Sequence, residues 1–126
     1  MDPKELAIKI AVILDSKKAL DVRVMGVNEL TSLGDYFVVC EATNSTQVKA
    51  LADEVDFQIG KLGQNPLRTE GYQSAGWVLL DYGDVIVHVF LNEARQFFNL
   101  ERLWGDAVMI DLPFEHQPGI ISQEKH

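Results

Sequence analysis

The fold of this chain is decided by the stretch Trp77–Phe90, which reads WVLLDYGDVIVHVF. Two β-prone runs, Trp77–Asp81 and Asp84–Phe90, flank the dipeptide Tyr82-Gly83. A short glycine-containing link between two such runs is typical of a β-hairpin. The stretch therefore predicts an antiparallel pair of strands, joined either by a two-residue turn or by a bulged or longer one, because tyrosine is less favourable than asparagine at the first turn position.

Such a hairpin has two unlike faces, because successive side chains of a strand point to opposite sides of the sheet. With a two-residue turn, Leu80 pairs with Val85 and Trp77 with His88. One face is aliphatic, and we expect it to form the core under helices; it carries Val78, Leu80, Val85, Val87 and Val89. The opposite face carries Trp77, Leu79, Asp81, Ile86, His88 and Phe90.

The second face is too apolar for a solvated surface, yet it contains ionisable groups that a plain core avoids. One interpretation is that another helix covers it, with His88 hydrogen-bonded beside Trp77. The others are a ligand pocket and a docking surface, since large aromatic side chains commonly anchor protein contacts. The residues alone leave these alternatives open.

The flanking sequence predicts helices and further strands. Asp2-Pro3 is typical of a helix start, with Asp2 as the N-cap, and the helix is expected to continue to about Lys18. The run 36–40 is apolar throughout, which indicates a central strand. Other strands are expected at 19–26 and 67–70, and other helices at 45–62, ended by Gly63, and at 92–103. We predict an α/β fold with a mixed, mainly five-stranded sheet and flanking helices.

Length and composition indicate one domain over residues 1–112, followed by a loose tail over 113–126. No apolar run approaches the roughly 20 residues of a membrane span, and Met1–Lys9 does not resemble a signal peptide, so a cytoplasmic location is expected. The single cysteine, Cys40, is interpreted as a small core residue. The formal net charge of -8 disfavours direct binding to DNA or RNA. In a partner that contains RNA, a protein component should supply the docking surface.

No metal site or cofactor is expected. Asp81 and Asp84 flank a turn, but no further ligands lie nearby in sequence, and His88, His116 and His126 are far apart. The main enzymatic alternative is a magnesium-dependent nucleotidyltransferase. Such an enzyme needs a glycine-serine loop followed by paired carboxylates, whereas this chain has alanine at 42, and its Asn44 or Ser45 is better explained as a helix N-cap. No catalytic residues are therefore assigned.

Motifs in both halves of the chain are similar to those of one protein family. They are LTSLGDYFVVC at 30–40, QVKALAD at 47–53, Glu70-Gly71, the hairpin stretch, and NLERLWGD at 99–106. On these motifs, which cover about residues 6–106, the chain resembles the ribosomal silencing factor (Iojap-like) family. It departs from the family pattern at Ala42 and Thr46, where glycine and arginine are usual.

The resemblance implies a fold related to nucleotidyltransferases without the catalytic residues. It also implies binding to the large ribosomal subunit through large-subunit ribosomal protein fourteen, on the face where the small subunit joins. The expected result is a block of subunit joining and repression of translation under nutrient limitation. Contact with RNA would be peripheral, and a homodimer is expected because family members are often dimeric in isolation.

On this reading the partner-binding residues lie on the second face of the hairpin. Trp77 would be the first anchor, and Leu79, Ile86, His88 and Phe90 would extend the patch. Charge complementarity would come from Asp81 or Asp84. Arg95 either contacts a partner or pairs with a nearby carboxylate on the surface.

Overall fold

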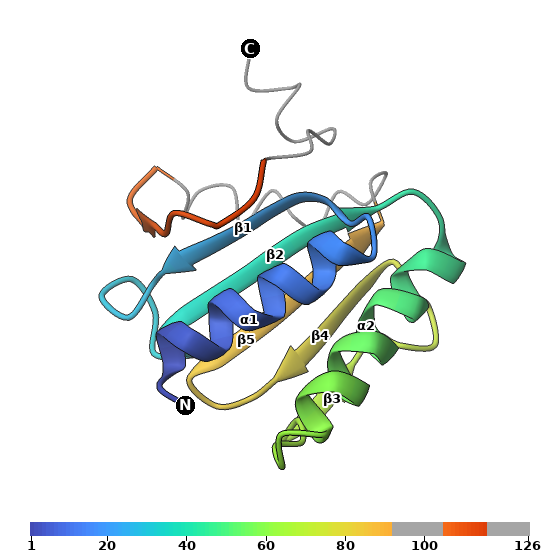
Figure 1. Cartoon of the computed structure of the whole chain (residues 1–126), viewed down its shortest axis with the longest axis horizontal. Coiled ribbons are helices and arrows are strands. Elements are labelled where there is room, and N and C mark those ends of the chain that lie inside the picture. The colour runs from blue at the N-terminus through green and yellow to red at the C-terminus, as the bar shows by residue number, and fades with distance from the viewer. Residues whose placement is uncertain (92–104, 116–126) are drawn as a thin grey trace.

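The computed structural model describes residues 1–91 and 105–115, which form one sheet and two helices (Figure 1). The elements are α1 (Pro3–Ser16), β1 (Leu20–Gly26), β2 (Tyr36–Ala42), α2 (Ser45–Gly60), β3 (Arg68–Glu70), β4 (Trp77–Asp81), β5 (Val85–Leu91) and β6 (Val108–Met109). The helix expected at 92–103 lies outside the described residues. Among the described residues, no helix is both long and apolar enough to cross a membrane.

The sheet has six strands in the order β3-β4-β5-β2-β1-β6. β2 and β5 are parallel, and the other neighbouring pairs are antiparallel. The mixed α/β architecture and the central place of β2 are therefore confirmed. The count of five strands was wrong, because β6 is too short to show a sequence pattern; it has two residues, which pair with Met25 and Gly26.

The hairpin is confirmed, but its predicted register is wrong by two residues. Trp77 pairs with Phe90 and Leu79 with His88, so the turn residues are Gly83 and Asp84. Gly83 has a φ of 88°, a left-handed conformation that a tight hairpin turn requires at its first position. Glycine adopts this conformation without strain, which explains why the turn starts one residue later than expected. A shift of two leaves both faces unchanged, since the side-chain period is two.

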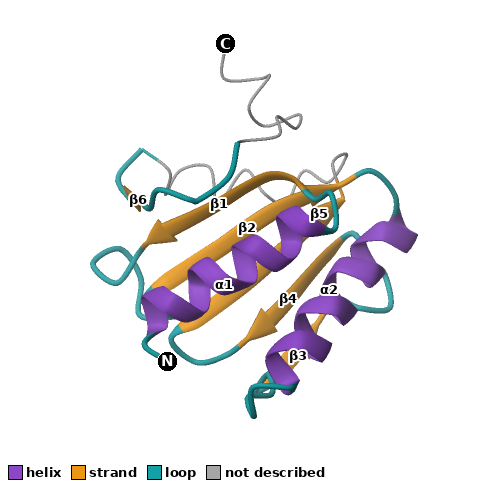
Figure 2. Cartoon of the chain, in the orientation of Figure 1, coloured by secondary structure: helices purple, strands orange, loops and turns teal. Residues whose placement is uncertain are grey.

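Both helices cover the same face of the sheet, as Figure 2 shows. α1 packs over β1, β2 and β5, and α2 packs over β2, β4 and β5. The aliphatic face of the hairpin forms the core beneath them, as predicted: Val78, Val85, Val87 and Val89 are fully buried, and Leu80 is nearly so. Cys40 belongs to the same core, which confirms its interpretation as a core residue.

The helix ends follow from local side chains. Asp2 caps α1 by accepting a hydrogen bond from the Glu5 backbone N–H at 2.8 Å, and Asn44 caps α2 by accepting one from Gln47 N–H at 2.8 Å. α1 ends at Ser16 and α2 at Gly60, each two residues earlier than predicted. Beyond α2, Gly63 has a φ of 86°, the left-handed conformation expected of a helix stop.

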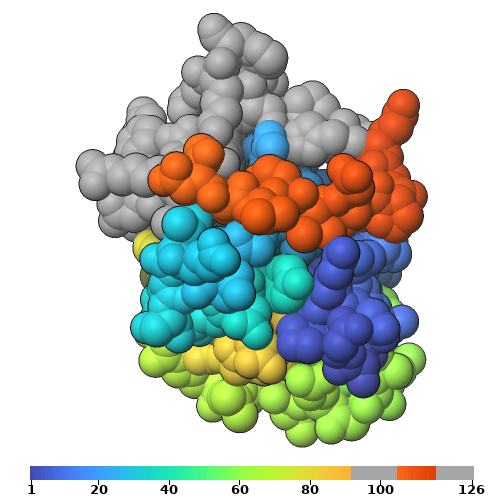
Figure 3. Space-filling view, turned by 90° about the vertical axis from the view of Figure 1, so that its left-hand side faces the viewer, coloured from blue at the N-terminus to red at the C-terminus, as the bar shows by residue number. Residues whose placement is uncertain are grey.

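Residues 105–115 lie along the outer edge of the sheet, above the body of the molecule in Figure 3. Backbone pairing extends past β6, since Ile110 N–H donates to the Val24 carbonyl at 3.0 Å. Leu112 and Phe114 pack against the helix-side core. Phe114 thus contacts the core from within the segment assigned to the tail; the division of the chain at residue 112 stays a prediction.

Gly71 allows the loop before β4 to pass close to the first residue of that strand. Gly71 has a φ of 79°, and a Cβ at this position would collide with the Trp77 carbonyl. We predict that Gly71→Ala lowers the free energy of unfolding by about 2 to 4 kcal/mol, through left-handed strain and this clash. Urea denaturation would measure the change. Gly76→Ala is the matched control, because nothing lies within 4 Å of its added Cβ; equal stability of the two variants would contradict the prediction.

Candidate interaction surface

The part of the second face that is open to solvent lies on β4 and the neighbouring β3. A hollow of about 260 Å³ is lined there by Glu70, Gly71, Trp77 and Leu79. Asp81 follows on the same side of β4, because it alternates with the buried Leu80. We call these five residues the Trp77 surface. It combines partly buried apolar side chains with carboxylates, the composition of a docking patch rather than of a solvated strand.

Trp77 is fixed by polar and aromatic contacts on its inner side. Its indole N–H donates a hydrogen bond to Nδ1 of His88 at 3.0 Å. Its ring also lies 5.1 Å from the Phe90 ring, measured between centroids. The hydrogen bond confirms the suggestion that His88 bonds beside Trp77. Trp77 also lines the hollow.

His88 is a buried neutral imidazole. Its Nδ1 must be the acceptor, since an indole N–H only donates, so its own proton resides on Nε2. The ring meets Phe37 edge-on at 4.7 Å and stacks over Phe90 at 6.1 Å. Burial lowers the pKa of His88 to about 3, because the charged form would lose its hydration. The face therefore carries no positive charge from His88 at neutral pH.

The carboxylates of the Trp77 surface share one arginine. Nε of Arg68 lies 3.1 Å from Oε2 of Glu70 and 3.2 Å from Oδ2 of Asp81. The other carboxylate oxygen of Asp81 accepts a hydrogen bond from the Gly83 N–H at 2.8 Å, which ties it to the hairpin turn. Because Arg68 and Glu70 are more than half exposed, these ion pairs add little to stability. The Glu70 carboxylate is accessible to a competing cation.

The predicted site residues occupy different depths. Trp77, Leu79 and Asp81 are partly exposed, and Asp84 is exposed at the turn. Ile86, His88 and Phe90 share their face but are buried, at 4%, 3% and 0% exposure. These three lie behind the surface rather than on it, because side chains of β1 and β2, such as Met25 and Phe37, pack on the same face. Arg95 lies outside the described residues.

Sequence reasoning missed Glu70 and Gly71 as lining residues, although the pair stood in the family motif. They come next to Trp77 because β3 pairs with β4, where Glu70 lies opposite Leu79. A three-residue edge strand has too short a pattern for its register to be read from sequence. Gly71 itself was the one available signal, since a glycine in a loop often marks a left-handed conformation or a close backbone approach.

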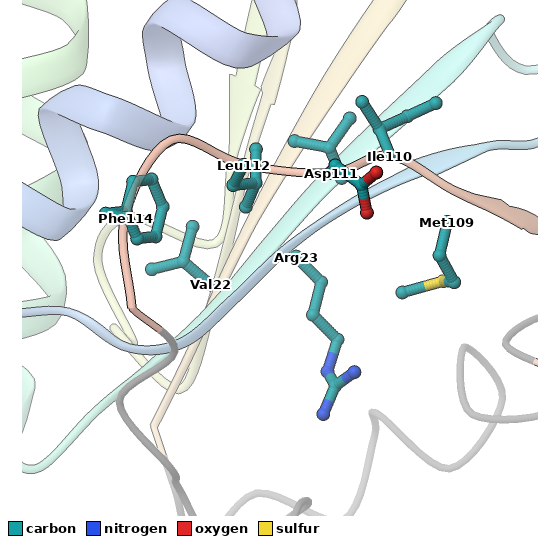
Figure 4. A pocket seen from close by; sticks show the side chains of 8 residues that line it. Val22, Arg23, Met109, Ile110, Asp111, Leu112 and Phe114 are labelled. Atoms are coloured by element: carbon teal, nitrogen blue, oxygen red, sulfur yellow. The ribbon is translucent and has the colours of Figure 1, made fainter.

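A second hollow, of about 300 Å³, lies where residues 109–114 cross β1 (Figure 4). Val22 faces Leu112 and Phe114 there, whereas Arg23 points to the other side. The Arg23 guanidinium pairs with the buried Asp21 at 2.9 Å. None of the predicted site residues that the structure describes lines this hollow.

The loop that the enzymatic alternative needs serves as a helix cap. Oδ1 of Asn44 accepts from Gln47 N–H, and the Gln47 side chain in turn accepts from Thr43 N–H at 2.7 Å. Asn44 is therefore an N-cap, as predicted, and its side chain satisfies a backbone N–H at the start of α2. Within residues 1–91 and 105–115, no three His, Cys, Asp or Glu residues are grouped to hold a metal ion.

Comparison with known proteins places this architecture in one family. The family model described as "Ribosomal silencing factor during starvation" matches residues 1–126. The chain belongs to the ribosomal silencing factor family. Membership in this regulatory, non-enzymatic family confirms both the predicted resemblance and the expectation that the protein is not an enzyme.

Individual relatives agree with this assignment. "Ribosomal silencing factor RsfS" of Bacillus subtilis is 39% identical over 114 residues, which cover 90% of this chain and 97% of that protein. "Protein Iojap, chloroplastic" of Zea mays is 34% identical over 88% of this chain and 48% of its own length. A crystal structure of a Chromobacterium violaceum protein, 34% identical, superposes with a TM-score of 0.76 over 91% of this chain and 95% of that one.

The buried imidazole predicts a pH dependence of stability in this silencing-factor chain. The pKa of His88 is about 3 when folded and near 6.5 when unfolded, so below pH 6.5 the unfolded state binds a proton that the folded state does not. Wild type should lose about 2 kcal/mol of unfolding free energy relative to His88→Gln between pH 7 and pH 5. Urea denaturation at both pH values measures it; parallel losses in the two proteins would contradict the assigned burial.

Proposed function

We propose that this protein is a ribosome silencer that acts from the large subunit. It would bind large-subunit ribosomal protein fourteen on the face where the small subunit joins, block joining, and so repress translation when nutrients are scarce. Support comes from its membership in a family described by silencing during starvation. A cytoplasmic location follows from this role, because the ribosome is its target.

The Trp77 surface is the proposed docking site. The observation that supports it is that the Trp77 indole, which donates a hydrogen bond to His88, lies beside an apolar hollow. Trp77 and Leu79 line this hollow together with Glu70 and Gly71. Tryptophan is frequent among residues that dominate binding energy, especially where it enters or lines a pocket. Ile86, His88 and Phe90 would support the site from behind, and Asp84 would lie toward its end at the turn.

Charge favours a basic protein as the contacted component. The chain has 19 acidic and 11 basic side chains, and Glu70 and Asp81 lie on the docking surface itself. Its field repels phosphate but attracts a positively charged protein patch. We therefore propose peripheral RNA contact at most. Arg95 as a contact residue and homodimerisation in isolation are part of the same proposal.

The proposal predicts selective binding to isolated large ribosomal subunits. Wild type should cosediment with large but not small subunits, and Trp77→Ala should raise the Kd at least tenfold, because a central aromatic anchor is lost. Phe57→Ala is the matched control: Phe57 is 60% exposed and lies on α2, in the layer on the other side of the sheet. Circular dichroism would verify that both variants fold.

Two outcomes would count against this function. Absence of cosedimentation with either subunit would remove the ribosomal target. Equal loss of binding in Trp77→Ala and Phe57→Ala would show that the Trp77 surface has no special part. A subunit-joining assay, in which light scattering follows reassociation, should show inhibition by wild type and by Phe57→Ala only.

A further prediction concerns the acidic rim. Glu70→Gln should slow association with large subunits by about two- to fivefold at low salt, because a rim charge acts mainly on the encounter rate. The difference should disappear above about 0.5 M salt, where the screening length is only a few ångströms. Asp56→Asn, an exposed acidic position on α2, is the control. An effect that persists at high salt would argue against steering by charge.

A further inference from the structure

The contact between Trp77 and His88 joins a surface side chain to a buried one. On the β4–β5 ladder, His88 lies opposite Leu79, so Trp77 and His88 are diagonal neighbours on one face. Diagonal positions are about 7 to 8 Å apart in a sheet, within reach of large side chains. The ring centroids lie 5.8 Å apart, and the hydrogen bond closes the remaining gap from indole nitrogen to imidazole nitrogen.

His88 is itself held so that its acceptor points at Trp77. Phe37 on β2 meets its ring edge-on, and Phe90 on β5 stacks over it with 7° between the ring planes. At 3% exposure the imidazole has no solvent space into which to turn. The direction of Nδ1 is therefore fixed by the packing of β2 and β5, the interior strands of the sheet.

The surroundings of His88 would suit an apolar side chain better. Its face forms a cluster of buried hydrophobic residues, namely Met25, Val27, Phe37, Val39, Ile86 and Phe90. A polar ring in such a cluster costs free energy unless a hydrogen bond compensates it. Within the described residues, the bond from Trp77 is the one that His88 makes. The imidazole thus serves a purpose that packing alone does not require.

We infer that His88 is a positioning residue that holds the Trp77 indole in one orientation beside the hollow that it lines. A fixed indole binds with a smaller loss of side-chain freedom than a mobile one, so the docking surface is preorganised. The use of this device in ribosome binding rests on the proposed function. The orientation of Trp77 by His88 does not, because it is a property of the free protein.

The test compares side chains at 88 that keep or remove the acceptor. His88→Gln and His88→Asn retain a carbonyl acceptor, whereas His88→Leu fills the space without one. The readout is the indole N–H signal of Trp77 in a proton–nitrogen NMR spectrum and its rate of hydrogen exchange. The chain has two tryptophans, and the spectrum of Trp77→Phe identifies the signal.

Wild type and at least one acceptor variant should show slow exchange of the Trp77 indole proton, and His88→Leu should exchange at least tenfold faster. In cosedimentation, His88→Leu should raise the Kd for large subunits roughly three- to tenfold, with rescue by the same acceptor variant. In a Trp77→Phe background, His88→Leu should change the Kd no further, because phenylalanine has no N–H to hold.

Slow exchange in His88→Leu, or fast exchange in both acceptor variants, would overturn the positioning role. Faster exchange with an unchanged Kd would overturn its contribution to docking. If wild type bound no subunit, the proposed function would fail, while the exchange rates would still decide whether His88 positions Trp77. The two ideas can therefore fail separately.

Discussion

The parallel pairing of β2 with β5 is the constraint on which the remaining structure depends. Seven residue pairs run from Tyr36–Val85 to Ala42–Leu91, and nearly all of these side chains are withdrawn from water on both faces. Parallel strands need a long crossover between them, and here the crossover carries α2, β3 and β4. The helices cover one face. The opposite face of β5 then offers buried side chains against which the partly exposed residues of β4 can be ordered.

That arrangement divides one hairpin into two functions. On the helix side, β4 and β5 contribute aliphatic packing; on the other side, their aromatic rings and His88 form a graded transition from core to surface. This face has few polar atoms. The pairing register of β4 with β5 sets where each of them lies. Such a rigid strand pair suits the docking surface proposed above, because strands hold side chains more accurately than loops.

Much of this was predictable because the hairpin stretch alternates so regularly. The two faces, the helices α1 and α2 and the central strand all followed from side-chain period and helix caps. The register could not be predicted in this way. A turn at Tyr82-Gly83 and a turn at Gly83-Asp84 differ only in which turn position needs a positive φ. β6 and the placement of Glu70 could not be predicted either, since strands of two and three residues take their positions from neighbours far along the chain. The depth of Ile86 and Phe90 depended on the strand order, which local sequence does not encode.

The two edges of the sheet have a consequence for handling the protein at high concentration. β3 has three residues and β6 has two, so both edge strands of the described sheet are very short, which limits the template that they offer to another chain. Charged side chains on β3 further discourage edge-to-edge pairing, which is how native sheets avoid fibre growth. With a net charge of -8 as well, the molecule should resist β-type aggregation during overproduction or concentration.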